Sequence, residues 1–317
     1  MARQKENKSE VSLSFEITPA LMAFRQISGD ANRFLNTQLV ALETLKTATP
    51  VRPSDLVLPW TLPAANAEWI ETRHFTLRST MVAVVDGLDR YMRVLSRVQG
   101  LVPEALHDDL NGRRRPELER RPAHFERVTS LYHYYPSAVP PQYVLAVELL
   151  ATWRNRFVHR SSKDSLSRGA RKGLLAAAAF FKKDHGGADV VAAIGRFDAG
   201  EPPTLSDLST LIASTHRLVT ALDEHLLLLQ DGGTYAVSLM RFLIKEQPEP
   251  SEYLERVFQY GGKRSAGKVH ALFLHNGAIH DVRRRANAPV LTRKKLNALL
   301  GLGRKDASAL FGIPRPV

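Results

Sequence analysis

One stretch of the sequence places an arginine, an asparagine and a histidine close together near the end of a segment with helical periodicity. Arg154, Asn155 and His159 lie close together in the chain. The surrounding segment, residues 148–160, reads ELLATWRNRFVHR. Histidine titrates near neutral pH and can donate or accept a proton, while arginine stays charged and presents a planar fork to phosphate oxygens. Residues of these types can bind an anion and exchange a proton beside it.

The segment 141–160 has the apolar spacing of an amphipathic helix. At 100° per residue, Asn155 and His159 lie about 40° apart and point away from the apolar stripe. Arg154 and Arg156 lie at the edges of this stripe. The pattern disfavours a histidine buried in the core and leaves two interpretations open, a solvated polar face and a functional site. The stripe that we expect to be buried contains Ala146, Leu149, Leu150, Trp153 and Phe157.

Helical periodicity dominates most of the chain. Apolar residues recur three and four positions apart, and Thr18 followed by Pro19 supplies a helix N-cap and a first-turn proline. Gly232 and Gly233 are expected to cap the end of the last long helix. Besides 141–160, helices are predicted over 18–47, 65–98, 124–132, 166–183 and 204–230.

The charge is concentrated near the C-terminus. The chain of 317 residues carries a net charge of +12, and residues 261–317 contain 12 of its 44 Lys/Arg residues but only two of its 32 Asp/Glu residues. Such a segment indicates a polyanionic partner. We therefore predict a flexible N-terminus over 1–17, a helical bundle over 18–231 and a basic module that contacts nucleic acid over 232–317.

The C-terminal module differs from the bundle in its predicted elements. A strand over 268–274, a turn, and a returning strand over 278–282 are expected, followed by a short helix over 293–300 that Thr292 caps. This α/β pattern loosely resembles a winged helix or helix-turn-helix unit. The nucleic-acid contacts predicted for the chain are Arg156, Arg160, Lys263, Arg264, Lys268, Arg283, Arg284, Arg285, Arg293, Lys294 and Lys295.

Several kinds of chemistry are excluded or disfavoured by composition. The chain has no cysteine, which excludes disulfides, thiolate metal sites and a cysteine nucleophile. The motifs GxGxxG, GxxxxGK[ST], HExxH and GxSxG are absent. His270, His275 and His280 recur every five residues, but without carboxylates at ligand spacing they favour a surface that faces nucleic acid over a metal site. We expect no metal and no cofactor.

No membrane association is expected from the hydrophobic pattern. The N-terminal residues are charged and lack the apolar core of a secretory signal. The longest uncharged apolar run, 173–181, is far shorter than the ~20 residues of a membrane-spanning helix. These features predict a cytoplasmic protein.

The segment Arg154-Asn155-x-x-x-His159 resembles the Arg-x(4–6)-His motif of the HEPN superfamily of helical ribonucleases. The likeness includes the polar residue after the arginine and the place of the motif near the end of an amphipathic helix. Arg127 with His133 and Arg264 with His270 have a compatible spacing but lack the asparagine. The resemblance covers residues 18–231 as an HEPN-like bundle.

The resemblance implies a metal-independent endoribonuclease in which Arg154, His159 and Asn155 are the catalytic residues. It also implies a homodimer whose two motifs form one cleft, and a toxin or phage-defence role with an antitoxin or defence-system protein as a further partner. RNA is the expected ligand, with DNA as an alternative for the C-terminal module. Two other hypotheses stay open: a non-catalytic regulator that binds nucleic acid, and a degenerate HEPN scaffold.

Overall fold

The computed structural model describes residues 13–45, 65–113, 122–159, 164–258, 262–280 and 288–314. These residues are mainly helical and include a small three-stranded antiparallel sheet, which confirms the predicted fold class at this level. The chain divides into two compact units. We call them the bundle unit, Ala23–Arg90 with Ala123–Val219, and the sheet unit, Met1–Met22, Tyr91–Pro122 and Thr220–Val317.

The long helices follow the predicted bounds closely. Thr18 caps the first of them, because its hydroxyl accepts a hydrogen bond from the N–H of Leu21 at 3.2 Å. Three helices contribute residues to both units: α1 (Pro19–Leu45), α2 (Ala65–Arg97) and α9 (Leu205–Leu228). The other helices of the bundle unit are α4 (His124–Tyr134), α5 (Pro141–Val158), α6 (Arg168–Ala176), α7 (Ala178–Asp184) and α8 (Val190–Asp198).

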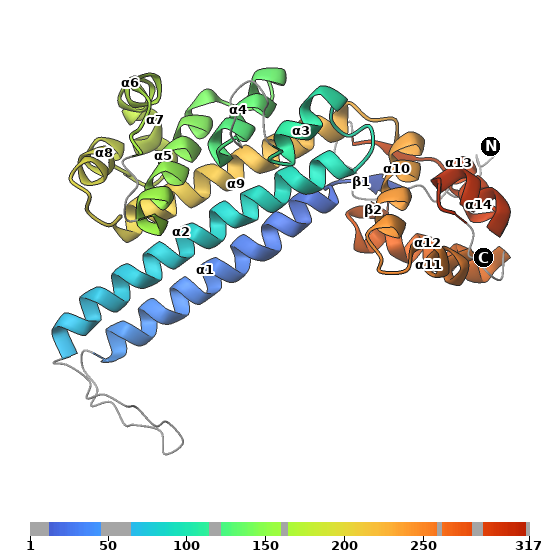
Figure 1. The fold of residues 1–317 in the computed structure, drawn as a ribbon, viewed down its shortest axis with the longest axis horizontal. Coiled ribbons are helices and arrows are strands. Elements are labelled where there is room, and N and C mark those ends of the chain that lie inside the picture. Colours follow the sequence, from blue (N-terminus) through green and yellow to red (C-terminus); the bar gives the residue numbers. More distant parts are fainter. Residues whose placement is uncertain are drawn as a thin grey trace, which may run out of the picture. The chain divides into compact units, whose positions relative to one another are not determined.

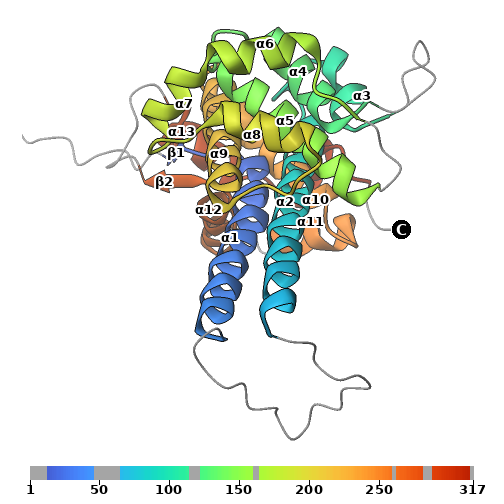
Figure 2. The ribbon, with the colours of Figure 1, turned by 90° about the vertical axis from the view of Figure 1, so that its left-hand side faces the viewer.

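Within the bundle unit, α1 and α2 lie side by side (Figure 1), and the short helices α6, α7 and α8 are grouped together (Figure 2). The single helix predicted over 166–183 is wrong, because the chain turns at Ala177, whose N–H is shared by three carbonyls of the preceding turn. This turn lets both Leu174 and Phe181 point into the core. Helix α8 was not predicted, although Asp189 caps it.

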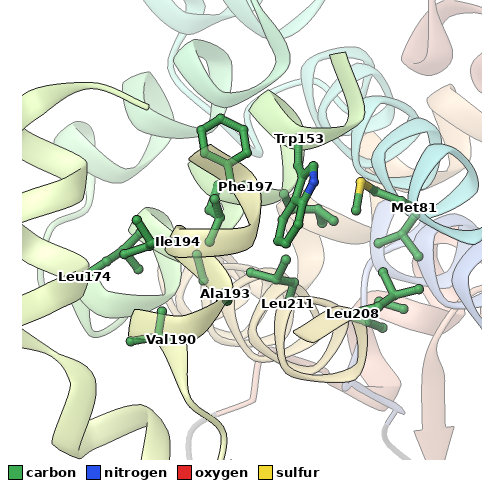
Figure 3. Close-up of a cluster of buried hydrophobic side chains, with 14 of the residues drawn as sticks. Met81, Trp153, Leu174, Val190, Ala193, Ile194, Phe197, Leu208 and Leu211 are labelled. Atoms are coloured by element: carbon green, nitrogen blue, oxygen red, sulfur yellow. The ribbon is translucent and has the colours of Figure 1, made fainter. Parts of the chain in front are cut away.

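One continuous hydrophobic cluster fills the bundle unit. Figure 3 shows part of it, with Trp153 of α5 close to Phe197 of α8 and with Met81 of α2 on its other side. The stripe predicted on α5 is confirmed, since its first four members are buried and Phe157 packs against the cluster. The core therefore fixes the rotation of α5 about its own axis, and with it the direction of the polar residues that follow Trp153.

The sheet unit is organised around a strand from the N-terminal segment. Strand β1 (Leu13–Phe15) is the centre of the sheet, flanked by β2 (Ala278–His280) and β3 (Val290–Leu291). All three residues of β1 are buried. For residues 13–15 the expectation of a flexible N-terminus is therefore wrong, while residues 1–12 lie outside the described part of the chain. A strand of three residues is too short to show an alternating pattern, so its pairing with distant strands could not be predicted from the sequence.

The predicted strand over 268–274 is wrong. These residues belong to helix α12 (Gly262–His275), which buries Val269 and Phe273 four residues apart on one face. The predicted helix over 293–300 is confirmed as α13 (Arg293–Leu300), and the side chain of Thr292 caps it. The remaining elements of the sheet unit are η1 (Glu104–Leu106), α3 (His107–Leu110), α10 (Gly232–Lys245), α11 (Pro250–Phe258) and α14 (Arg304–Phe311).

Two glycines allow the close backbone approaches that this unit requires. Gly277 has φ +93°, and a Cβ atom there would lie 2.0 Å from the carbonyl oxygen of Ile17. Gly232 begins α10 instead of capping α9, and a Cβ atom there would lie 2.1 Å from the carbonyl oxygen of Val290. Larger residues at these positions would separate the sheet from the segments that pack on it.

Candidate active site

Helix α5 ends one residue before His159, which changes the predicted position of this histidine. His159 is the C-cap residue, with φ −113° and ψ 92°, and its N–H donates to the carbonyl oxygen of Asn155 at 2.9 Å. This helical hydrogen bond keeps His159 at the last turn of α5, although its own backbone angles are no longer helical. The His159 side chain is exposed, and it makes no hydrogen bond or ion pair with the described residues.

The residue before the motif anchors the end of α5 in the core. Trp153 is 1% exposed, and its indole N–H donates to the carbonyl oxygen of Glu201 at 3.1 Å. Its ring meets that of Phe197 edge to face, with centroids 5.8 Å apart (Figure 3). Because a buried ring with a satisfied polar atom has one favourable position, the backbone that carries Arg154 is well defined.

Arg154 is held by long contacts. Its guanidinium donates to Oδ1 of Asn155 at 3.3 Å and to Oδ1 of Asp86, on α2, at 3.5 Å. Its Nε is buried and has no hydrogen-bond partner among the described residues. Arginine offers five N–H donors, so this side chain retains unused donor capacity. An anion that replaced Asp86 would gain shorter, charge-assisted hydrogen bonds.

Arg156 is held much more firmly. Its Nε donates to the carbonyl oxygen of Asp164 at 2.6 Å, and its Nη1 donates to the carbonyl oxygen of Phe197 at 2.6 Å. Its guanidinium also lies 3.8 Å from the centroid of the Phe197 ring. These contacts join α5 to α8 and to the segment that follows the motif. They give Arg156 a structural role.

Asn155 helps to hold the same returning segment. Its side-chain amide donates to Oδ2 of Asp164 at 3.1 Å, while its oxygen accepts from Arg154. The asparagine thus links the arginine to the residues that follow the motif. Arg160, one of the predicted nucleic-acid contacts, lies outside the described residues.

Acidic residues around α5 tune the local charge. Arg171 donates to both carboxylate oxygens of Asp198 at 2.6 Å, and these hydrogen bonds lower the pKa of Asp198. The nearby charge of Arg156 lowers the pKa of Asp198 further. Asp86 is different, because 59% of its side chain is exposed. Of these carboxylates, Asp86 is the one that solvent or a ligand can most readily displace.

The other arginine–histidine pairs of compatible spacing do not form such a site. Arg127 is 2% exposed and forms an ion pair with Asp89. His133 lies on the exposed side of the same helix. Arg264 and His270 both belong to α12. Arg154 differs from the buried Arg127 in its ion-pair partner, because the side chain of Asp86 is 59% exposed and that of Asp89 is 16% exposed.

The residues of the sheet unit that were predicted to contact nucleic acid have differing environments. Arg293 and Lys294 are exposed on α13. Lys295 instead pairs with Asp231, with its Nζ 2.9 Å from Oδ2, and Lys268 donates to the carbonyl oxygen of Arg256 at 2.6 Å. The backbones of Lys263 and Arg264 belong to α12, but their side chains are outside the description, as are Arg283, Arg284 and Arg285 entirely.

The three recurring histidines do not converge on one point. The rings of His270 and His280 lie 5.2 Å apart, while His275 ends α12. Burial lowers the pKa of His270, and the neighbouring His280 lowers it further. Among the described residues, no group of three or more histidine or acidic side chains could hold a metal ion.

Sequence reasoning missed the acidic partners of the motif. Asp86 lies far before the motif in the sequence, and Asp164 follows it. An isolated aspartate on a predicted helix or loop gives no signal of its own.

None of the helices in the described ranges is long and apolar enough to span a membrane. No protein-family model matches this chain, and neither the curated proteins nor the solved structures include a significant match.

Proposed function

We propose that this protein is an HEPN-like, metal-independent endoribonuclease and that Arg154 and His159 carry its chemistry. The observation that supports the proposal most strongly is the state of Arg154, whose Nε is buried without a partner and whose other contacts are 3.3 and 3.5 Å long. An arginine that serves only structure would have shorter hydrogen bonds, as Arg156 has at 2.6 Å. The RNA phosphate would replace Asp86 on the guanidinium of Arg154.

The proposed reaction uses the 2′-hydroxyl of RNA as the nucleophile. His159 accepts the proton of this hydroxyl while its oxygen forms a bond to phosphorus. The bond from phosphorus to the 5′-oxygen breaks, and that oxygen receives a proton. Arg154 stabilises the negative charge that accumulates on the phosphate oxygens. The products are a 2′,3′-cyclic phosphate and a 5′-hydroxyl end.

We further propose that two copies of the chain combine their motifs in one cleft. His159 is exposed at the end of α5, where a second copy can approach it. A two-fold contact would place the His159 of one copy beside the Arg154 of the other. A toxin or phage-defence role, with an antitoxin or defence-system protein as regulator, is what the family resemblance adds to this proposal.

The test uses purified protein and a defined RNA in excess EDTA. We expect cleavage that leaves the two ends named above, and a decrease of about 10²–10³-fold in rate for Arg154→Ala. His159→Ala should give a comparable loss. Arg33→Ala is a matched control, because Arg33 lies in the same unit and its side chain is 69% exposed. Cleavage only with added Mg²⁺ or Mn²⁺ would overturn the mechanism, and no cleavage by wild type would favour the scaffold hypothesis.

Mixing inactive variants tests the shared cleft. We expect Arg154→Ala and His159→Ala proteins to recover activity when their subunits exchange, because a mixed dimer contains one intact pair. No recovery, together with a monomeric mass of active wild type by light scattering, would remove the dimer from the proposal.

A second candidate function is non-catalytic binding of nucleic acid by the sheet unit. The observation in its favour is the exposure of Arg293 and Lys294 on α13, where neither side chain has an ion pair among the described residues. Phosphate contacts of this kind give binding that weakens steeply with salt. Binding of RNA or DNA by a protein that does not cut RNA would support this candidate.

A further inference from the structure

A second group of polar side chains lies along the same helix as Asp86. Asp86 and Asp89 are three residues apart on α2 and therefore lie on neighbouring parts of one face, with Cβ atoms about 5–6 Å apart. Asp86 contacts Arg154 of α5, whereas Asp89 contacts Arg127 and His124 of α4. Helices α4 and α5 pack against each other. This face of α2 therefore brings a second histidine close to the candidate site.

The second group consists of His124, Asp89 and Arg127, and it combines an imidazole with a carboxylate that is itself held in place. Arg127, with a side chain 3% exposed, forms an ion pair with Asp89 and fixes its carboxylate. The buried Nδ1 of His124 lies 3.4 Å from Oδ1 of Asp89, which is an ion-pair distance without the geometry of a hydrogen bond. Because Nδ1 is buried beside the carboxylate, Nε2 is the nitrogen left for a substrate. The side chain of His124 is 26% exposed, so the ring is accessible from the surface.

The start of α4 is fixed by its own contacts. The N–H of Ala123 donates to Oε2 of Glu126 at 2.8 Å, which closes the first turn of the helix around His124. Among the described residues, Asp89 of α2 forms an ion pair with His124, while Arg127 and Glu126 of the same helix contact Asp89 and Ala123. The arrangement of an imidazole, an orienting carboxylate and a residue that fixes the carboxylate is the one that general acid–base sites use.

We propose that His124, oriented by Asp89, is the second proton-transfer residue of the RNA-cleaving site and acts on the leaving 5′-oxygen. This inference rests on the proposed function. In-line cleavage requires one proton to leave the 2′-oxygen and another to reach the 5′-oxygen on the opposite side of phosphorus. One imidazole cannot serve both positions at once. Because Asp86 and Asp89 link the two groups through α2, His124 and Arg154 come from the same chain, whichever copy supplies His159.

The step involves two proton transfers, and each proton has a donor and an acceptor. As the bond between the 2′-oxygen and phosphorus forms, His159 gains the proton of the hydroxyl. As the bond between phosphorus and the 5′-oxygen breaks, Nε2 of His124 donates its proton to that oxygen. Asp89 touches neither atom and acts as a positioning residue, whose carboxylate lies beside Nδ1 of the ring. Exchange with solvent returns both histidines to their starting forms.

A substrate with a better leaving group separates this role from the others. In an RNA dinucleotide whose 5′-bridging oxygen is replaced by sulfur, the thiolate departs without being protonated. We expect His124→Gln to cleave the oxygen substrate about 10²–10⁴-fold more slowly than wild type, and the sulfur substrate at nearly the wild-type rate. His159→Ala should slow both substrates. His133→Gln is the matched control, because His133 is an exposed histidine on the same helix and should cleave both as wild type does.

The positioning role of Asp89 is tested with the same two substrates. We expect Asp89→Asn to slow cleavage of the oxygen substrate more than cleavage of the sulfur substrate, because only the oxygen substrate needs the proton that His124 donates. A change that only weakened folding would lower the melting temperature and slow both substrates equally. Because Arg127 is buried beside Asp89, this variant is at risk of misfolding, and His124→Gln carries the decisive result.

The outcomes distinguish the two proposals. Equal slowing of both substrates by His124→Gln, or no slowing of either, would overturn the role of His124 and leave the proposed function standing. A wild-type protein that cuts neither RNA nor the sulfur substrate would overturn the proposed function and the role of His124 together.

Discussion

The last turn of α5 and the helix α13 both present positive charge, but they use it differently. At α13, Lys295 is paired with Asp231, whereas Arg293 and Lys294 are exposed without an ion pair among the described residues. At α5, the guanidinium of Arg154 has one buried N–H without a partner and no contact shorter than 3.3 Å. The number of cations in a segment therefore does not measure the charge available to a ligand, because a cation that is already paired has less donor capacity left.

The same contrast exists within α5 over two residues. Arg154 and Arg156 are chemically identical, and the sequence places both at edges of the polar face. Carbonyl groups of Asp164 and Phe197 occupy Arg156, whereas an exposed carboxylate faces Arg154. A carbonyl of the folded backbone cannot be exchanged without unfolding, but a surface carboxylate can be exchanged for a phosphate.

The largest effect that separates the two regions is expected from removing the C-terminal segment. Deleting residues 261–317 removes both strands that flank β1, and it removes Phe273, whose ring lies 5.7 Å from that of Phe15. Phe15 is fully buried, and the loss of such an aromatic contact costs several kcal/mol. We therefore expect the sheet unit to unfold, as judged by rapid amide hydrogen exchange in residues 220–258. Unchanged protection of this segment would show that the C-terminal residues act only through their charge.

The next effect sharpens the contrast between the two arginines. Arg156→Ala leaves two carbonyl groups without their donor and removes the stacking on Phe197, so we expect it to lower the free energy of unfolding by about 1–3 kcal/mol. Arg154→Ala should lower it by less than about 1 kcal/mol, because its contacts are long and partly exposed. Urea unfolding followed by circular dichroism measures both. Equal losses would mean that Arg154 is as structural as Arg156.

Sequence reasoning succeeds where one helix face decides the outcome. The buried stripe of α5, the N-cap at Thr18 and the cap of α13 at Thr292 all depend on residues within one or two turns. It fails where distant segments decide. The pairing of β1 with β2 joins residues far apart in the chain, and the helical state of 268–274 depends on burying Val269 and Phe273 in the sheet unit.

The candidate site follows the same division. Arg154, Asn155 and His159 are visible in the sequence because they are close together. Their acidic neighbours are not, because Asp86 belongs to α2 and Asp164 follows the motif beyond the end of the helix. The difference between Arg154 and Arg156 was equally invisible, since it depends on carbonyl groups that reach α5 only in the folded protein.

A smaller effect is expected from the exposed cations of α13. Each phosphate contact that is lost reduces the dependence of log K on log salt by about 0.7–0.9. We expect the double variant Arg293→Ala/Lys294→Ala to reduce this slope by nearly the amount that corresponds to two phosphate contacts. Lys295→Ala should reduce the slope by less than one contact, because Lys295 is paired with Asp231. Fluorescence anisotropy with labelled RNA at several salt concentrations measures the slopes. An equal effect of Lys295→Ala would show that RNA displaces Asp231.

The smallest effect concerns the titration of Asp231. Its hydrogen bond from Lys295 and a second one from the N–H of Thr234 lower the pKa of Asp231 from 3.8 to about 2. A carboxylate with a lowered pKa stabilises the folded state above pH 3.8, and this contribution is lost as the pH falls toward 2. In Lys295→Met we expect the pKa of Asp231 to rise toward 3.8 without reaching it, because the N–H of Thr234 remains. Acid unfolding of this variant should therefore depend less on pH between these values. Carboxyl NMR titration measures the pKa directly, and an unchanged value would show that Lys295 is not committed to Asp231 and is available to a ligand.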